Sequence, residues 1–405
     1  MASISVCGVN SVETNAVIKT KIQAKKLRFG ETKCHQLHIG GNKTLCPNLT
    51  VNKDDKVEKI NEDKYLGGVV SDVASNEKKI DYARNKGTAT ISSIMAILKE
   101  VSLGHHYLEI AMLLRETLFV NVILWNIETW YNLTTKEIEQ LEIIDTMLLK
   151  RILEVPTSTP SALLYLELGI TPLPYIIQAK RIMFLKYILS RPKDDLLRKF
   201  FDAQCKKPSK NDWCITVQQD LDDLEIDEDF ESIANIKKEK LSSIVKKAYK
   251  QKAFEDLLAL QEQYSKGSQL LYGQLAMREY LKSQNLNINQ KKLIFKLRTR
   301  MFQVKSNFKN NNMKNMKCPC CNIEVDDQIH LIKCEKLDAA KVDNSEYFTL
   351  FGNNDEKMSK MIQKLEKITK QRNIILEDKN NVHHNQVDNL GPRAPYCVSV
   401  PLYIN

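Results

Sequence analysis

A cluster of cysteines and one histidine near residue 320 constrains this chain more than any other feature of its sequence. Cys318, Cys321, His330 and Cys334 follow the pattern C-x2-C-x8-H-x3-C. Three thiolates and one imidazole form the ligand set of a closed tetrahedral zinc site, so four side chains must converge on one point. A closed site leaves no position open for a substrate. The pattern therefore predicts a structural zinc ion.

Cys320 lies inside the same turn, and it competes with its neighbours for a place at the metal. The x2 spacing of Cys318 and Cys321 suits a tight turn that points both sulfurs inward, so we expect Cys320 to be the extra thiol. The segment 326–334 is amphipathic, and we expect a short helix to bring His330 and Cys334 to the ion. The alternative is that these cysteines are ordinary buried packing residues.

Composition limits the class of protein. The chain has 405 residues and a net charge of +10, which favours polyanionic partners. Ten cysteines, several of them clustered, indicate a reducing, intracellular compartment better than a disulfide framework. The first residues lack the basic start and long apolar core of a signal peptide. Charges interrupt every long apolar stretch, so we expect no membrane span.

Hydrophobic periodicity divides the chain into two parts that differ in their expected secondary structure. Residues 1–70 read as mixed α/β, whereas helix follows helix from about residue 75. Thr134 or Thr135, with Glu137 two or three residues on, resembles the start of a capping box, and Gly169 is placed to end a short helix. The polar sequence after about residue 378 lacks periodicity and predicts disorder. The acidic run 220–231 predicts a solvated helix face.

The segment 290–317 is strongly basic, with nine Lys or Arg residues and no acid. Phenylalanines alternate with these cations, and aromatic rings can stack on bases while cations contact phosphates. The alternative is an ordinary helix with a solvated basic face. The candidate nucleic-acid ligands in this segment are Lys292, Lys296, Arg298, Arg300 and Lys305.

Several blocks, taken in order, resemble the C-terminal part of a non-LTR (LINE-type) retrotransposon reverse transcriptase. The blocks are residues 24–40, residues 64–71, the long stretch 138–189 with its "LYLELG" motif, and the Cys/His cluster. The resemblance covers roughly residues 1–378 and depends on the order of the blocks. It implies a mostly α-helical fold with a small α/β piece at the N-terminus, a helical thumb and connector, and a C-terminal zinc knuckle.

The resemblance also implies roles for individual residues. Lys33 matches the lysine of the late palm motif, which lies near the incoming nucleotide. Tyr65, Leu66 and Gly67 match the primer-grip turn, where the palm passes into the thumb. The four Cys/His residues match the ligands of the family's knuckle. RNA or an RNA–DNA duplex is the implied partner, and the nucleus is the implied location.

The departure from the family concerns catalysis. Family polymerases hold magnesium with an aromatic-x-Asp-Asp hairpin and an earlier aspartate, and the Asp-Asp pairs of this chain lie in unsuitable surroundings. Without the metal ions, phosphoryl transfer lacks its charge stabilisation. We therefore expect a fragment that binds nucleic acid and is not an enzyme by itself, magnesium belonging to the full-length parent. The alternative is a host-adopted, zinc-stapled helical protein-interaction module.

The expected organisation has five parts. They are a palm and primer-grip remnant at 1–74, a helical thumb-like domain at 75–205, a basic helical connector at 206–310, a zinc-knuckle region at 311–378 and a disordered tail at 379–405.

Overall fold

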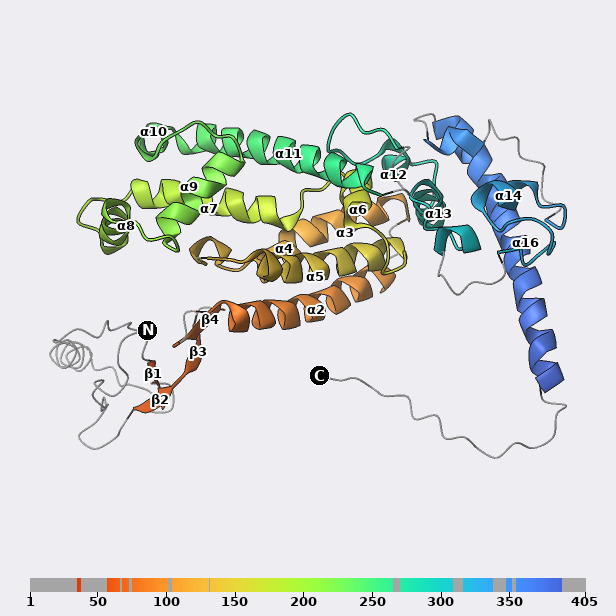
Figure 1. The fold of residues 1–405 in the computed structure, drawn as a ribbon, viewed down its shortest axis with the longest axis horizontal. Coiled ribbons are helices and arrows are strands. Elements are labelled where there is room, and N and C mark those ends of the chain that lie inside the picture. The colour runs from red at the N-terminus through yellow and green to blue at the C-terminus, as the bar shows by residue number, and fades with distance from the viewer. Residues whose placement is uncertain are drawn as a thin grey trace.

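Helices dominate the structure, a computed structural model, and a small strand region precedes them (Figure 1). This confirms the predicted mostly α-helical class with a small N-terminal sheet piece and a Cys/His cluster near the C-terminus. Lys33, Leu66 and Gly67 lie outside the described residues. The structure describes residues 35–37, 57–65, 68–72, 75–100, 104–130, 132–264, 270–308, 316–337, 347–351 and 355–387.

The strands form two small pairs beside the first long helix (Figure 1). β1 (His35–Leu37) pairs in parallel with β2 (Glu58–Ile60), and β3 (Glu62–Tyr65) pairs antiparallel with β4 (Gly68–Ser71). β3 and β4 therefore form a hairpin, in which Tyr65 lies opposite Gly68. The hairpin leads directly into α2, and β4 contacts that helix.

The first part of the helical region packs around α2 and α5. Gly87 lies on the buried face of α2, where an added Cβ would be 2.9 Å from Ile123 Cγ2. Absence of a side chain at this position lets α2 approach α4 and α5 closely. Thr134 and Glu137 form the expected capping box at the start of α5. The elements are α2 (Glu77–Glu100), η3 (Gly104–His106), α3 (Tyr107–Leu114), η4 (Arg115–Phe119), α4 (Val120–Ile123), η5 (Ile127–Thr129), α5 (Thr135–Leu153) and α6 (Ser161–Leu168).

A π-helical segment, η4, lies between α3 and α4 and interrupts an apolar helical stretch. It begins at Arg115. Arg115 is 4% exposed, and its Nε and Nη2 donate to Asp145 at 2.7 and 2.6 Å. A π-turn shifts the register of a helix. The interruption therefore coincides with the residue whose guanidinium must reach a buried carboxylate on α5.

A second apolar cluster includes the C-terminal half of α7 (Leu173–Leu189) and joins elements on both sides of residue 205. Its buried members run from Ile182 to Val245. Arg181 and Asp220 cross this region as a buried ion pair, with Nη2 and Oδ1 2.6 Å apart. The packing therefore does not separate at the expected boundary between residues 205 and 206. The elements are α7 (Leu173–Leu189), α8 (Leu196–Lys206), α9 (Trp213–Asp223), α10 (Phe230–Asn235) and α11 (Lys238–Glu262).

The C-terminal elements belong to the first apolar cluster, which runs from Ile80 to Ile368 and includes Cys318, Cys320 and Cys334. The last helix crosses the face of the region that holds α13 and α14 (Figure 1). It continues to Val387, so the helix includes residues 379–387 of the segment expected to form the tail. The elements are α12 (Glu279–Lys282), α13 (Ile288–Arg298), η6 (Lys305–Phe308), α14 (Gln328–Lys333), η7 (Thr349–Phe351) and α16 (Asp355–Val387).

Among the described residues, no single helix has the length and hydropathy needed to cross a membrane. α6 and α7 reach those values together, but the pair is bent by 66°.

Candidate metal centre and basic surfaces

Cys318, Cys321, His330 and Cys334 converge as the spacing predicted. Their ligand atoms all lie within 4.8 Å of one another. The Sγ atoms of Cys318 and Cys334 are 3.9 Å apart, and Cys321 Sγ lies 3.3 Å from His330 Nε2. Two sulfurs bound tetrahedrally at ~2.3 Å from zinc lie about 3.8 Å apart. The four side chains could therefore hold a metal ion of this size and geometry.

Local backbone structure explains how distant ligands meet. The Cys318 amide donates to Glu324 O at 2.7 Å, and the Asn322 amide donates to Cys318 O at 2.8 Å. These bonds close a tight turn in which Asn322 has a φ of 60°. Asp327 then caps α14 by accepting from the His330 amide at 2.6 Å. The turn supplies two cysteines, α14 supplies His330, and Cys334 directly follows the last residue of α14, so the short predicted helix brings both ligands to the site.

A carboxylate orients the histidine. His330 Nδ1 lies 2.8 Å from Glu324 Oε2, while Nε2 faces Cys321. A histidine that binds a metal through one nitrogen commonly donates the other N–H to a carboxylate, which fixes the ring and its tautomer. Glu324 was missed by the sequence reasoning, although its position within the x8 loop could have suggested it.

The surroundings of the cysteines shift the pKa values of their thiols in different directions. Burial raises the pKa of Cys334 to about 12. Burial also opposes ionisation of Cys321, but the backbone amides of Glu324 and Ile323 and the His330 side chain outweigh it and lower the pKa of Cys321 to about 6. A cation among the sulfurs favours the thiolate form of each. The donor set therefore fits a soft divalent ion.

Cys320 lies outside the four-ligand group, as expected for the extra thiol. Burial raises the pKa of Cys320 to about 11. The neighbouring Asp326 is 1% exposed, and its Oδ2 accepts from Arg372 Nη2 of α16 and from the Lys305 amide, both at 2.9 Å. This ion pair ties the knuckle to the last helix.

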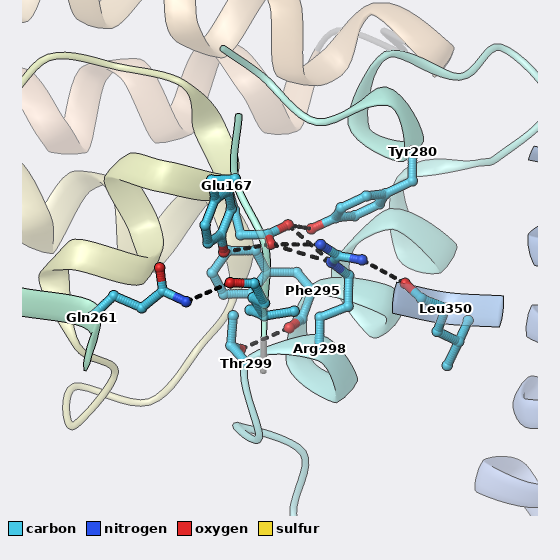
Figure 2. A network of polar contacts seen from close by, with 9 residues as sticks. Glu167, Gln261, Tyr280, Phe295, Arg298, Thr299 and Leu350 are labelled. Carbon is cyan, nitrogen blue, oxygen red and sulfur yellow. Dashed lines mark hydrogen bonds and ion pairs between the residues drawn. The ribbon is translucent and has the colours of Figure 1, made fainter. Parts of the chain in front are cut away.

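The predicted nucleic-acid ligand Arg298 lies inside the core instead of on a surface. It is 1% exposed, and its Nε and Nη2 donate to Glu167, which is fully buried. Its Nη1 donates to Leu350 O at 2.6 Å, and Tyr280 Oη donates to the same glutamate (Figure 2). The guanidinium thus joins α6, α13 and η7. Its structural role in this conformation leaves no donor directed to a phosphate.

The other predicted ligands divide between buried and exposed positions. Lys292 is 6% exposed and donates to Glu154 at 2.7 Å. Lys296 is half-buried and lies in the same region. Lys305 Nζ donates to Lys317 O at 2.8 Å, and Arg300 is exposed with a φ of 53°. The residues therefore do not form one continuous basic face, and nucleic-acid contact by Lys296, Arg300 and Lys305 stays a prediction.

A basic groove that the sequence reasoning missed lies between α7, α11 and the η4–α4 segment. Its volume is about 1070 Å³, and five lysines line it against Glu116 and Glu128. Tyr187 is 47% exposed there and lies parallel to Phe184, with ring centroids 5.9 Å apart. The sequence shows lysines at helical spacing on each of two separate helices. It does not show that these helices face each other, because they are distant along the chain. The groove lysines are Lys180, Lys186, Lys238, Lys246 and Lys250.

Of the remaining predicted residues, the structure describes only Tyr65. Tyr65 ends β3, and the structure describes its backbone pairing. Lys33, Leu66 and Gly67 are outside the described residues, so the roles implied for them stay predictions.

Comparison of the chain with protein families, with curated proteins and with solved structures gives no match.

Proposed function

We propose that this chain is the thumb-and-knuckle part of a non-LTR retrotransposon reverse transcriptase, and that it binds RNA or an RNA–DNA duplex in the groove between α7 and α11. Any catalytic aspartates of such an enzyme would lie outside these 405 residues. The chain alone then binds nucleic acid and does not polymerise it.

The observation that carries the proposal is the charge and shape of the groove. Lys238, Lys246 and Lys250 are exposed on one helix, and Lys180 lies on the facing helix. None of these four lysines has an ion-pair partner among the described residues. A phosphate backbone releases counterions when it meets such an array. Tyr187 is half-exposed beside the lysines and packs against Phe184 and Arg191, so it adds an aromatic side chain that a base can contact at its exposed part.

The resemblance supplies the identity of the partner. A hairpin at the proposed primer-grip turn leads directly into α2, and a helical bundle follows, which is the order that the resemblance implies. The Cys/His centre supports the proposed zinc knuckle because it has the ligands and spacing of a closed zinc site. We propose zinc as the resident ion, with a structural role.

The test measures RNA affinity by fluorescence anisotropy between 50 and 200 mM salt. We expect affinity to fall steeply with salt for a single-stranded RNA and for an RNA–DNA duplex. The double variant Lys246→Gln/Lys250→Gln removes two cations that lie one helical turn apart on the groove wall. For RNA single strands the log–log salt slope should decrease by about 1.4, because each lost phosphate contact contributes about 0.7.

The matched control changes two lysines on another part of the same helix. Lys240 and Lys247 are exposed on α11 but do not line the groove. Lys240→Gln/Lys247→Gln alters the net charge equally and should keep most of the affinity. Equal losses in both double variants would exclude a specific groove. Salt-independent binding, or none, would instead favour the zinc-stapled protein-interaction module.

A further inference from the structure

A second, smaller pocket lies between α13, α16 and the segment after α5. Its volume is about 320 Å³, at the lower end of the range for small-ligand sites. Lys292, Lys296 and Arg372 line it, and Glu154 is the one acidic residue in the lining. Apolar side chains, including Phe302, complete the walls. The pocket does not share a residue with the lysine groove.

Two polar side chains of this pocket have unmet hydrogen-bonding capacity. Arg372 is 4% exposed, and its Nη1 is buried without a partner among the described residues. The Thr369 hydroxyl, one turn earlier on α16, is also buried without a partner there. A buried polar group without a hydrogen bond costs free energy, typically about 1–3 kcal/mol. Such groups point to a ligand that supplies acceptors.

The charges of the pocket specify the kind of acceptor. Lys292 is paired with Glu154, whose side chain is 63% exposed, and Arg372 Nη2 is paired with Asp326. Lys296 has no ion-pair partner among the described residues. Burial lowers the pKa of Lys296. The Glu154 carboxylate opposes this shift and Lys292 adds to it, so the nearby carboxylate does not fully offset the cost of burying the charge. An anion beside Lys296 would favour the charged form of this lysine.

We propose that this pocket binds an oxyanion of the phosphate class, with Lys292, Lys296 and Arg372 as cationic ligands and the Thr369 hydroxyl as a further donor. A phosphoryl group offers several acceptor oxygens, which suits guanidinium, ammonium and hydroxyl donors together. The apolar walls leave room for part of a nucleoside. The ligand is then either a free nucleotide or the phosphorylated end of a strand.

The experiment titrates the full chain, loaded with zinc, by calorimetry at constant ionic strength. Inorganic phosphate and pyrophosphate are the probes, and acetate is the comparison anion. We expect saturable binding of the phosphate probes and little of acetate. Lys296→Gln should weaken phosphate binding roughly tenfold to a hundredfold, as expected for a charge-assisted hydrogen bond. Lys370→Gln, an exposed lysine of α16 outside the pocket, should leave it unchanged.

Thr369→Val separates ligand binding from folding. The valine removes an unpaired buried hydroxyl, so the free protein should keep or raise its melting temperature while phosphate binding weakens about two- to tenfold. Phosphate affinity equal to the wild type in both Lys296→Gln and Thr369→Val would overturn the proposal, as would acetate binding as tightly as phosphate. The groove variant Lys246→Gln/Lys250→Gln should keep phosphate binding, so failure of the RNA proposal is distinguishable from failure here.

Two further probes identify the source of the phosphate. Uridine monophosphate tests a free nucleotide, and a pair of short RNAs with a 5′-phosphate or a 5′-hydroxyl tests a strand end. Tighter binding of the phosphorylated RNA that is lost in Lys296→Gln assigns the strand end. Binding of the mononucleotide, with no effect of end phosphorylation, assigns the free nucleotide. Either result supports the pocket, and failure of all these probes to bind contradicts it.

Discussion

Buried charges distinguish this protein at the scale of single residues. Arg115, Arg181 and Arg298 each pair with a buried carboxylate, and Arg298 was predicted to bind nucleic acid instead. Asp220 lies in the acidic run that predicted a solvated helix face, yet it is 3% exposed. Composition cannot show which charge finds a partner, because the partners are 30 to 131 positions apart.

The Glu167–Arg298 pair is the first place to test this arrangement. Glu167→Gln leaves the guanidinium buried without a compensating charge, so we expect a loss of about 3–5 kcal/mol in the free energy of unfolding. Denaturant unfolding measures it. The double variant Glu167→Gln/Arg298→Met removes both charges and should recover part of the loss. A double variant no more stable than Glu167→Gln would show that the charge pair is not the cause.

Glu142 gives a prediction about pH. Burial, and then the carboxylates of Asp145 and Glu139, raise the pKa of Glu142 to about 7, against an ordinary value of 4.5. The folded state therefore holds more protons than the unfolded state between pH 4.5 and 7. The protonated Glu142 side chain therefore contributes to the free energy of unfolding below pH 4.5, and this contribution is lost as the pH rises to about 7.

Glu142→Gln keeps the neutral shape at every pH. The melting temperature of this variant should exceed that of the wild type at pH 8, and the difference should shrink at pH 5. Glu139→Gln, one turn away and exposed, is the control and should show a smaller dependence on pH. A shift in melting temperature that is the same at both pH values would contradict a titrating Glu142.

Helix ends decide how the elements connect. Gly169 ends α6 with a φ of 65°, as its sequence position predicted. The structure adds a reason that the sequence did not contain: a Cβ here would lie 1.9 Å from Met277 N and 2.0 Å from Ala276 C. Contact with the segment before α12, more than 100 residues away, therefore requires glycine as strictly as the backbone angle does.

Gly104 separates these two reasons. It has a φ of 48°, but an added Cβ would meet nothing within 4 Å among the described residues. Gly104→Ala should cost about 1–2 kcal/mol through the left-handed conformation alone. Gly169→Ala also forces a backbone to move, and we expect at least about 3 kcal/mol. Equal losses, measured by thermal unfolding, would exclude the contact with residues 276–277 as a constraint.

The Cys/His centre acts at the scale of the whole molecule because its cysteines belong to the main apolar cluster. Asp326 and Gln328 beside it bond to α16 and to the end of α13. The centre therefore anchors the C-terminal elements to the helical bundle. Loss of a metal ion would affect the region from α13 to α16 together.

Removal of one ligand tests this role. Cys334→Ser should lose the bound zinc, about one ion per chain, and should lower the melting temperature as strongly as a chelator does. Cys320→Ser changes a buried cysteine outside the ligand set and should retain the zinc. Equal zinc content in Cys334→Ser and the wild type would contradict the assignment of Cys334 as a ligand. Zinc loss in Cys320→Ser would show that Cys320 is itself a ligand.

Local sequence determined the parts of this protein that depend on neighbouring residues. The Cys/His spacing, the capping box at Thr134, the glycine at the end of α6 and the mostly helical class all follow from residues a few positions apart. Tertiary structure alone decided where the charges lie. It placed Arg298 in the core, gathered lysines from α7 and α11 into one groove, and brought Lys296 beside Thr369 and Arg372. Burial and ion pairing depend on elements that meet only after folding, so no window of sequence contains them.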